Sequence, residues 1–424
     1  MGLISEIIFC LLTLFSIGMF VQKILRIRRN ILLGKKADLN DHPGQRWKHV
    51  ILLALGQKKM FQKPIVAILH LIVYVGFIVI NIELLEIIID GILGTHRVLK
   101  NQLGEIYNLL INSFEILALL VIVACILFLI RRNVLKIKRF ISKDLEGWPR
   151  SDANFILITE IILMVLFLLM NAADHEGNFL ISNQIKPWLS ARFNHSQLYL
   201  IENIAWWLHI IGIYAFMNYL PYSKHLHIIL AFPNAYYAPL IPKGVIHNMP
   251  AIQNEVLYAM QPELAPANAA APDSFGAKDA TELSWKNLMD AYSCSECGRC
   301  SETCPANITG KILSPRKIMM ATRDRIETIS KNIDLNKVFV PDGKTLLHDY
   351  ITVEELRACT TCNACVEACP ISISPLDIII ELRRSLVMEQ SNAPQEWNSM
   401  FSNIENNFAP WKFSPDDRDA WTNA

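Results

Sequence analysis

The chain contains the stretch Cys294-Ser-Glu-Cys297-Gly-Arg-Cys300-Ser-Glu-Thr-Cys304-Pro305 and repeats its spacing in Cys359-Thr-Thr-Cys362-Asn-Ala-Cys365-Val-Glu-Ala-Cys369-Pro370. In this pattern a tight turn presents three thiolates to one face of a cubane cluster, and the fourth thiolate reaches the other cluster. The spacing therefore predicts two [4Fe-4S] clusters. One has the ligands Cys294, Cys297, Cys300 and Cys369, and the other has Cys359, Cys362, Cys365 and Cys304.

Two other uses of clustered cysteines fit the pattern less well. Structural zinc sites consist of paired C-x-x-C elements and do not need four cysteines in each of two identical runs. Disulfides are disfavoured because the orientation argued below places this segment in the cytoplasm, where thiols are kept reduced.

The sequence around the motifs predicts helices. Ser314-Pro315 is an N-cap followed by proline at the first helical position, and it opens an amphipathic helix to about Ser330. Ser374-Pro375 repeats the signal before a helix to about Met388, and a short helix from Glu282 to Tyr292 leads into the first cysteine. The 54 residues at positions 305–358 are too many for a compact β-rich bacterial ferredoxin. The domain resembles the α-helical carboxyl-terminal half of succinate dehydrogenase iron–sulfur subunits.

The first half of the chain is apolar. Hydrophobic residues make up 52% of the sequence and charged residues 19%, whereas soluble domains have roughly 25% charged residues. A bilayer core needs about 20 apolar residues, and five stretches reach that length, approximately 3–22, 64–89, 106–130, 154–173 and 198–229. The formal charge of +1 excludes a globally basic nucleic-acid-binding protein.

The distribution of Lys and Arg between these stretches predicts their orientation. Residues 23–63 contain eleven Lys and Arg residues and residues 131–150 contain seven, whereas the other two loops contain two each. The positive-inside rule places such loops in the cytoplasm. We therefore expect a multi-pass protein of the cell inner (cytoplasmic) membrane, with the amino terminus outside and the cysteine-rich domain in the cytoplasm.

Histidines inside two of the stretches suggest a haem site. His70 and His227 lie at similar depths on helices predicted to be antiparallel, as two axial ligands of one haem iron require. His209 and His227 are eighteen residues apart, or five turns of a continuous helix, so they would share one face. His225 would then point to lipid headgroups or solvent. The alternative is that these side chains only make interhelical hydrogen bonds.

The same residues carry a resemblance to a known family. His209-Ile-Ile-Gly and Leu220-Pro-Tyr-Ser-Lys-His-Leu-His227 resemble the last helix of the cytochrome b subunit of respiratory nitrate reductases. Leu69-His70-Leu71 followed by Tyr74-Val-Gly-Phe77 resembles the helix that carries that family's cytoplasmic-side ligand. The family has five spans and two haems, and its fifth helix gives one histidine to each. The resemblance therefore implies a b-type haem on His70 and His227.

The sequence departs from that family at its outer-side ligand. Ten residues after His70 the chain has Ile80, followed by Asn81, where the family has a histidine. His209 is therefore expected either to hold a second haem with another partner or to serve a site for menaquinone or another quinone. Carboxylates inside a bilayer are costly and often functional, which makes four acids candidates for proton exchange at a quinone: Glu83, Glu115, Glu160 and Glu202. The alternative for each is a position in the headgroup region.

A second resemblance covers roughly residues 283–424. Leu283-Ser-Trp285, the first cysteine motif and the segment from Asn406 to Trp421 resemble the ferredoxin part of the heterodisulfide-reductase family. In single-chain relatives a domain with repeated Cys-Cys-Gly motifs follows, and this sequence contains no such motif. The resemblance implies that the substrate site lies on a cytoplasmic partner, either a Cys-Cys-Gly-domain iron–sulfur subunit or a flavoprotein. The fused layout resembles the membrane arms of such reductases and of flavoprotein:menaquinone oxidoreductases.

Together these features predict an all-α chain with four parts. A five-helix transmembrane cytochrome b-like bundle occupies 1–235, a linker 236–282, an α-helical dicluster ferredoxin domain 283–392, and a tail for partner docking 393–424. The expected function is electron transfer between membrane quinone and a cytoplasmic redox partner, with quinone oxidoreduction as the only activity of its own. A redox sensor or assembly factor and a purely structural anchor are the alternatives. No glycine-rich nucleotide loop supports an NAD, flavin or ATP site.

Overall fold

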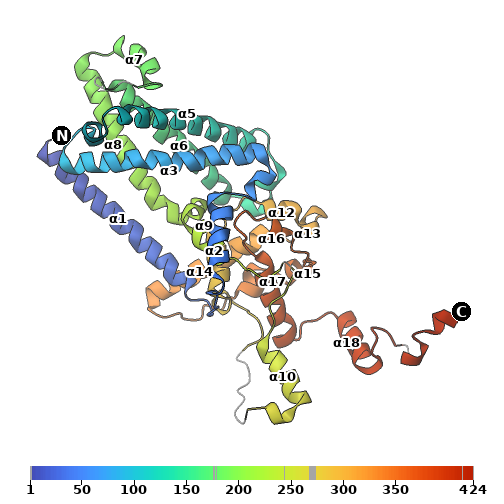
Figure 1. Cartoon of the computed structure of the whole chain (residues 1–424). Coiled ribbons are helices and arrows are strands. Elements are labelled where there is room, and N and C mark those ends of the chain that lie inside the picture. The colour runs from blue at the N-terminus through green and yellow to red at the C-terminus, as the bar shows by residue number, and fades with distance from the viewer. Residues whose placement is uncertain are drawn as a thin grey trace.

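The computed structural model describes residues 2–174, 177, 179–242, 244–266, 274–412 and 414–423. Within these residues the regular structure is helical throughout and contains no β-strand, only two isolated bridges. The predicted all-α fold class is therefore confirmed. Figure 1 shows the two parts of the molecule, a bundle of long helices and a smaller group of short helices beside one end of it.

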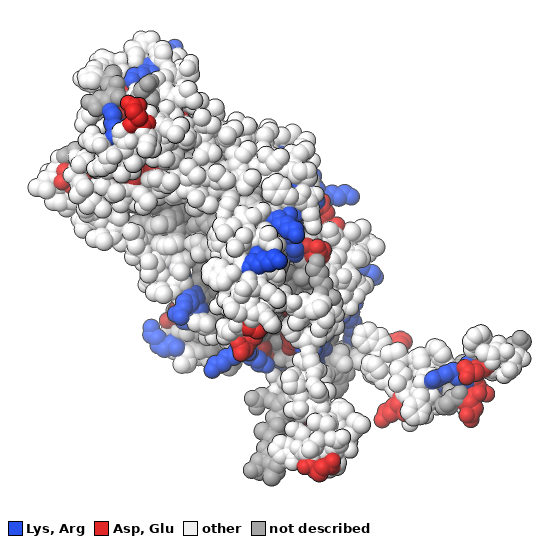
Figure 2. Space-filling view, viewed as in Figure 1, with Lys and Arg blue, Asp and Glu red and all other residues white. Residues whose placement is uncertain are grey.

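Five helices are long and apolar enough to cross a membrane, and they confirm the five predicted spans. They are α1 (Leu3–Ile31), α3 (Pro64–Leu93), α5 (Glu105–Asn133), α6 (Trp148–Ala173) and α8 (His195–Tyr219). Helix α6 packs against both α5 and α8, and α3 packs against α5. Figure 2 shows that the sides of these helices carry almost no charge in this view, whereas charged residues gather at the ends of the bundle and on the second half. This distribution matches the apolar interior of a bilayer.

The fifth span differs from its prediction. Helix α8 ends at Tyr219, and two short turns, Leu220–Tyr222 and Lys224–Leu226, separate it from α9 (His227–Tyr236). Pro221 has no N–H for a helical hydrogen bond, and Ser223 has extended backbone angles. The periodicity that related His209 to His227 therefore does not apply.

The prediction for His225 was wrong for the same reason. Its ring is half-buried, and its centroid lies 5.7 Å from that of His227 and 5.5 Å from that of Phe216. The two turns after α8 direct it into the protein instead of toward lipid headgroups or solvent.

The second half of the chain is built from short capped helices. They are α11 (Trp285–Ser293), α12 (Arg299–Thr303), α13 (Pro305–Ile308), α14 (Pro315–Asn336), α15 (Val353–Arg357), α16 (Ala364–Ala368) and α17 (Pro375–Arg384). The side chains of Ser314 and Ser374 accept hydrogen bonds from backbone N–H groups of the first turn of α14 and α17. Both predicted Ser-Pro helix starts are confirmed.

The two halves share one hydrophobic core. Ile27 and Ile31 of α1 and Leu220 after α8 belong to the same buried cluster as Leu283 and Leu288 of the cysteine-rich half. Burial of apolar surface contributes roughly 25 cal/mol per Å², so this shared core holds the cysteine-rich half in a fixed position against the end of the bundle.

Buried ion pairs reinforce the same junction. The guanidinium of Arg316 is 1% exposed and donates to the carboxylate of Asp144, in the loop before α6, at 2.9 and 2.7 Å. A third bond runs from Arg316 Nη1 to the carbonyl oxygen of Arg139 at 2.7 Å. On the other side of the junction Glu296 accepts from Lys224 at 2.8 Å and from Arg323 at 2.6 Å. Loops of the bundle thus bind the cysteine-rich half through charged groups that are mostly buried.

Replacing Asp144 by alanine is expected to weaken this junction. The variant leaves the Arg316 guanidinium buried without its carboxylate, which typically costs about 3–5 kcal/mol. We expect a lower Tm and faster hydrogen exchange in residues 138–146, measured by mass spectrometry on detergent-solubilised protein. Glu146→Ala is the matched control, because Glu146 is an exposed acid of the same loop and surface changes stay within about 0.5 kcal/mol. Equal Tm values for the two variants would show that the pair does not hold the junction.

Two further helices project from the molecule (Figure 1). Helix α10 (Pro250–Met260) lies in the predicted linker 236–282, of which residues 243 and 267–273 are outside the described residues. Helix α18 (Gln395–Asn407) exposes Trp397, Phe401 and Ile404, spaced by four and three residues on one face. Such a face suits a partner, and the docking role of residues 393–424 stays a prediction.

Candidate functional site

The two cysteine motifs have the same backbone conformation. Glu296 and Gly298 have positive φ in the first motif, and Thr361 and Asn363 have positive φ at the equivalent positions of the second. Each motif then enters a five-residue helix, α12 or α16, and the two helices pack together. Both stretches therefore make the tight turn that gathers three thiolates, as their spacing predicts.

The cysteines fall into two groups by electrostatic proximity. The pKa of Cys294 is raised to about 12, first by burial and then by the charges of Glu296, Cys297 and Cys369. Burial also raises the pKa of Cys365 to about 12, with further contributions from Cys359, Cys304 and Cys362. The fourth cysteine of each motif thus lies with the first three of the other. This proximity supports the crossed ligand sets, which stay a prediction.

The raised pKa values mean that these thiols need a metal to ionise. A metal-bound thiol loses its proton because the cation compensates the buried negative charge. An iron–sulfur cluster supplies that compensation, so the donor set fits the predicted group. Each set contains buried cysteines, Cys294 in the first and Cys304 and Cys365 in the second, and Cys362 of the second set is exposed.

A cavity of about 410 Å³ joins the cysteines to the membrane bundle. His70, His225 and His227 line it from the bundle and the turns after it. Five cysteines line it from the other half, Cys294, Cys297, Cys300, Cys365 and Cys369. All four cysteines of the first predicted ligand set therefore face the same space as the histidines.

The structure brings His70 and His227 together, as predicted from their depth. Their ring centroids are 6.4 Å apart. His70 Nδ1 lies 3.0 Å from Gln57 Oε1, and His227 Nδ1 lies 2.9 Å from the carbonyl oxygen of Lys224. Hydrogen bonds of this kind fix the ring orientation and leave Nε2 for a metal. The side chain of His225 has no such bond among the described residues, and its Nε2 is buried without a partner.

Cationic side chains surround the same cavity. They are Arg131, Arg132, Arg139, Lys224, Arg299 and Arg316, and Glu160 is the one acid among the described lining residues. Among the described residues Arg131, Arg132 and Arg299 form no ion pair with a carboxylate. The walls between them are apolar and include Tyr74, Phe77 and Ile156. The cavity thus suits a flat apolar group with negative charges at its edge.

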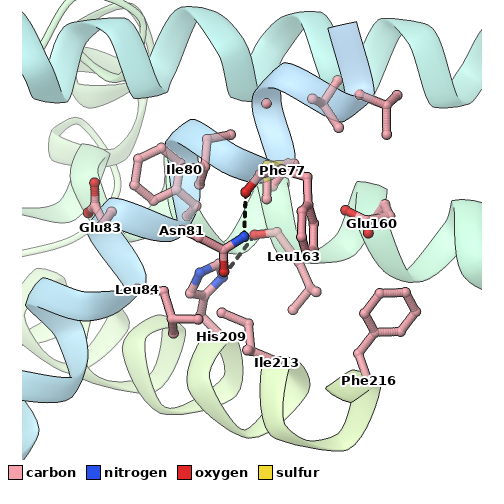
Figure 3. Close-up of a pocket in the computed structure, with 15 residues that line it drawn as sticks. Phe77, Ile80, Asn81, Glu83, Leu84, Glu160, Leu163, His209, Ile213 and Phe216 are labelled. Atoms are coloured by element: carbon pink, nitrogen blue, oxygen red, sulfur yellow. Dashed lines mark hydrogen bonds between the residues drawn. The ribbon is translucent and has the colours of Figure 1, made fainter. Parts of the chain in front are cut away.

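A second, smaller pocket surrounds His209 (Figure 3). Its volume is about 80 Å³, and its lining includes Ile80, Asn81, Glu83 and Glu160. His209 Nδ1 donates to the carbonyl oxygen of Leu163 at 3.0 Å, which leaves Nε2 as an acceptor. No second histidine is part of the described lining.

This pocket does not fit a second haem. The volume of about 80 Å³ is far below that of a porphyrin, and His209 is the one histidine in the described lining. Ile80 lies where a second ligand would be needed, and its side chain cannot bind iron. Of the two roles expected for His209, the quinone site stays a prediction.

The four acids of the spans differ in their surroundings. Glu115 accepts from the backbone N–H groups of Ile181 and Ser182, and Glu202 lies 3.2 Å from His96. Glu83 Oε2 is buried without a partner, and Glu160 forms no hydrogen bond or ion pair with any described residue. Two of the candidates thus have structural roles, and two remain available for proton exchange.

Sequence reasoning missed two parts of the site. The contribution of Gln57 depends on the loop before α3 folding back over His70. The cationic lining comes from basic residues that the sequence indicated only as markers of membrane orientation, such as Arg131 and Arg139. The many Lys and Arg residues next to a helix that carries a histidine were the sequence signal that could have indicated this lining.

Comparison with known proteins agrees with the cysteine-rich part of this description. Residues 293–373 match a 4Fe-4S dicluster domain. The chain is 26% identical to a probable iron-sulfur-binding oxidoreductase, FadF, of Bacillus subtilis, over 98% of this chain and 60% of the relative. It is 25% identical to an EtfAB:quinone oxidoreductase of Syntrophomonas wolfei, over 90% of this chain and 54% of the relative. The chain therefore spans little more than half the length of these two proteins.

A third relative matches a quarter of the chain. It is one of the subunits of a ferredoxin/F(420)H(2)-dependent CoB-CoM heterodisulfide reductase of Methanosarcina acetivorans, 35% identical over 25% of this chain and 53% of the relative. No solved structure matches the chain. These similarities and the five long apolar helices indicate a membrane protein with a 4Fe-4S dicluster domain. The chain is homologous to heterodisulfide-reductase-like oxidoreductases.

Proposed function

We propose that the chain is the electron-transfer subunit that connects the membrane quinone pool with a cytoplasmic redox partner. Its carriers are one b-type haem held by His70 and His227 and the two [4Fe-4S] clusters. The observation that carries the proposal is the shared cavity of about 410 Å³, which these two histidines and the four cysteines of the first ligand set all line.

The spacing of the two imidazoles supports the haem. A metal–imidazole bond is about 2.0 Å long and a ring nitrogen lies roughly 1.1 Å from its ring centroid, so two axial imidazoles have centroids about 6.2 Å apart. The rings of His70 and His227 are 6.4 Å apart. Arg131, Arg132 and Arg299 are placed to pair with the carboxylates of a porphyrin. A haem there supplies one-electron redox chemistry, and the protein fixes its position and ligands.

The order of the carriers is inferred from the cysteines that line the cavity and from the exposure of Cys362. The cluster on Cys294, Cys297, Cys300 and Cys369 faces the haem cavity, whereas the other cluster has the exposed Cys362 among its ligands. We infer that electrons pass between haem and partner through the first cluster and then the second. The name of the Methanosarcina relative, a subunit of a larger reductase, supports a protein partner, either an iron–sulfur subunit or a flavoprotein.

On the membrane side we propose a quinone at His209. The name of the Syntrophomonas relative includes a quinone as substrate, which supports this choice. The pocket is lined by residues of α3, α5, α6 and α8, and Phe77 in its lining is 41% exposed. A ring entering from the bilayer would place one oxygen near His209 Nε2. The orientation with the amino terminus outside remains part of the proposal.

Quinol-driven reduction of the clusters tests the proposed function. Purified full-length protein in proteoliposomes is mixed anaerobically with menadiol, and cluster reduction is followed by electron paramagnetic resonance. We expect reduction in the wild type and its loss, by at least about 100-fold in rate, in His70→Ala. Dithionite should still reduce the clusters of the variant. An unchanged rate with menadiol would overturn the proposed electron path and favour a sensor or an anchored ferredoxin.

A further inference from the structure

Glu160 occupies a special position along α6. Residues before it on this helix, Ala153, Ile156 and Leu157, line the large cavity at the histidine pair. Residues after it, Leu163 and Met164, line the small pocket at His209. Glu160 itself lines both. The two spaces therefore meet at this residue.

The boundary between the two spaces is otherwise apolar. Among the described lining residues the two spaces share Val73, Phe77 and Glu160. Val73 and Phe77 cannot carry a proton, so the carboxyl group of Glu160 is the one shared group that can. A carboxylate in a membrane interior without a charged partner is expensive to maintain, which argues for a functional role.

We propose that Glu160 carries protons between the quinone site at His209 and the large cavity on the side of the cysteine-rich domain. The inference rests on the proposed function. Conversion between quinol and quinone breaks or forms two O–H bonds and exchanges two electrons with the haem site, one at a time. His209 Nε2 accepts a proton from, or returns it to, the nearer ring oxygen, and Glu160 passes protons on toward the charged loops.

The other unpaired acid lies on the opposite side of His209. Figure 3 shows Glu83 and Glu160 on either side of the imidazole in this view. Glu83 lines only the small pocket and lies near the buried charges of Arg97 and Glu86, toward the other end of the bundle. A route through Glu83 would move protons to the outer side of the membrane, whereas a route through Glu160 moves them to the side of the clusters. The contact of Glu160 with both spaces favours the second route.

Proton-coupled haem reduction distinguishes these routes. Full-length protein in proteoliposomes is mixed with menadiol, haem reduction is followed by absorbance, and a pH dye inside the vesicles reports where protons appear. We expect Glu160→Gln to slow haem reduction by menadiol about 100-fold, within the range of a lost general base, and to leave reduction by dithionite unchanged. Glu160→Asp should recover part of the rate. Glu105→Gln, an exposed acid at the start of α5, is the control with wild-type behaviour.

The outcomes separate the inference from the function on which it rests. A wild-type rate in Glu160→Gln, or a slow rate confined to Glu83→Gln with protons on the outer side, overturns the role of Glu160 and leaves the proposed function intact. A wild-type protein that contains haem but does not react with menadiol overturns both. If Glu160→Gln does not bind haem, the rate of haem reduction by menadiol is compared between Glu160→Asp and Glu160→Ala. Equally low rates in these two variants contradict the proposal.

Discussion

Alanine at His70 or at His227 is expected to abolish haem binding. Each variant leaves one imidazole without its partner, and no other residue is expected to replace the lost ligand, so a single imidazole would hold a b-type haem far less firmly than two. We expect less than about a tenth of the wild-type haem per chain, measured by the dithionite-reduced absorbance spectrum of detergent-purified protein. The clusters should remain, with about eight iron atoms per chain.

His225→Ala is the matched control for these variants. His225 lines the same cavity, but its ring is perpendicular to that of His227, at 88°, and no hydrogen bond orients its side chain. We expect it to retain most of its haem, with at most a shifted spectrum. Loss of haem in His225→Ala with retention in His70→Ala would show that the axial pair is a different one.

The second large effect concerns the crossing of the cluster ligands. Removing one thiolate from a four-cysteine site is expected to lose that cluster, so iron falls from about eight to about four atoms per chain. The crossed sets predict which variants resemble one another. Cys304→Ala should lose the same cluster as Cys365→Ala, and Cys369→Ala the same cluster as Cys300→Ala.

Electron paramagnetic resonance of the reduced variants identifies the surviving cluster. The cluster left in Cys304→Ala and Cys365→Ala is the one beside the haem cavity, so it should still accept electrons from menadiol. The cluster left in Cys300→Ala and Cys369→Ala should not. If the spectrum of Cys304→Ala matched that of Cys300→Ala, each motif would hold its own cluster and the crossed assignment would be wrong.

Local signals were enough to predict most of the fold. The five spans follow from apolar length, and the starts of α14 and α17 follow from Ser-Pro pairs whose side-chain caps the structure confirms. The error came at Pro221 and Ser223, where a continuous periodicity was assumed across a proline. A break of two short turns rotates the following residues by an amount that sequence spacing does not give, and this changed the surroundings of His225.

The parts of the site whose ligands lie within one sequence motif could be predicted. The parts that loops from elsewhere in the chain contribute were harder to predict. The eight cysteines and the pairing of His70 with His227 were accessible from spacing and depth. The partners that orient or surround them, such as Gln57, Arg299 and Arg139, come from segments far apart in the chain. Their positions depend on how the loops of the bundle pack on the cysteine-rich half, and no local pattern encodes that.

The hydrophobic core shared by the two halves has a consequence for biogenesis. Ile27 and Ile31 of the first helix complete a core that also contains Leu283 and Leu288, more than 250 residues later in the chain. The cysteine-rich half therefore reaches its final packing only after the first helix has been inserted and the last helices have been translated. Until then its apolar surface is open, and cluster insertion and chaperone protection must act in that interval. Substitutions in the first helix can thus impair maturation of the clusters without touching any of their ligands.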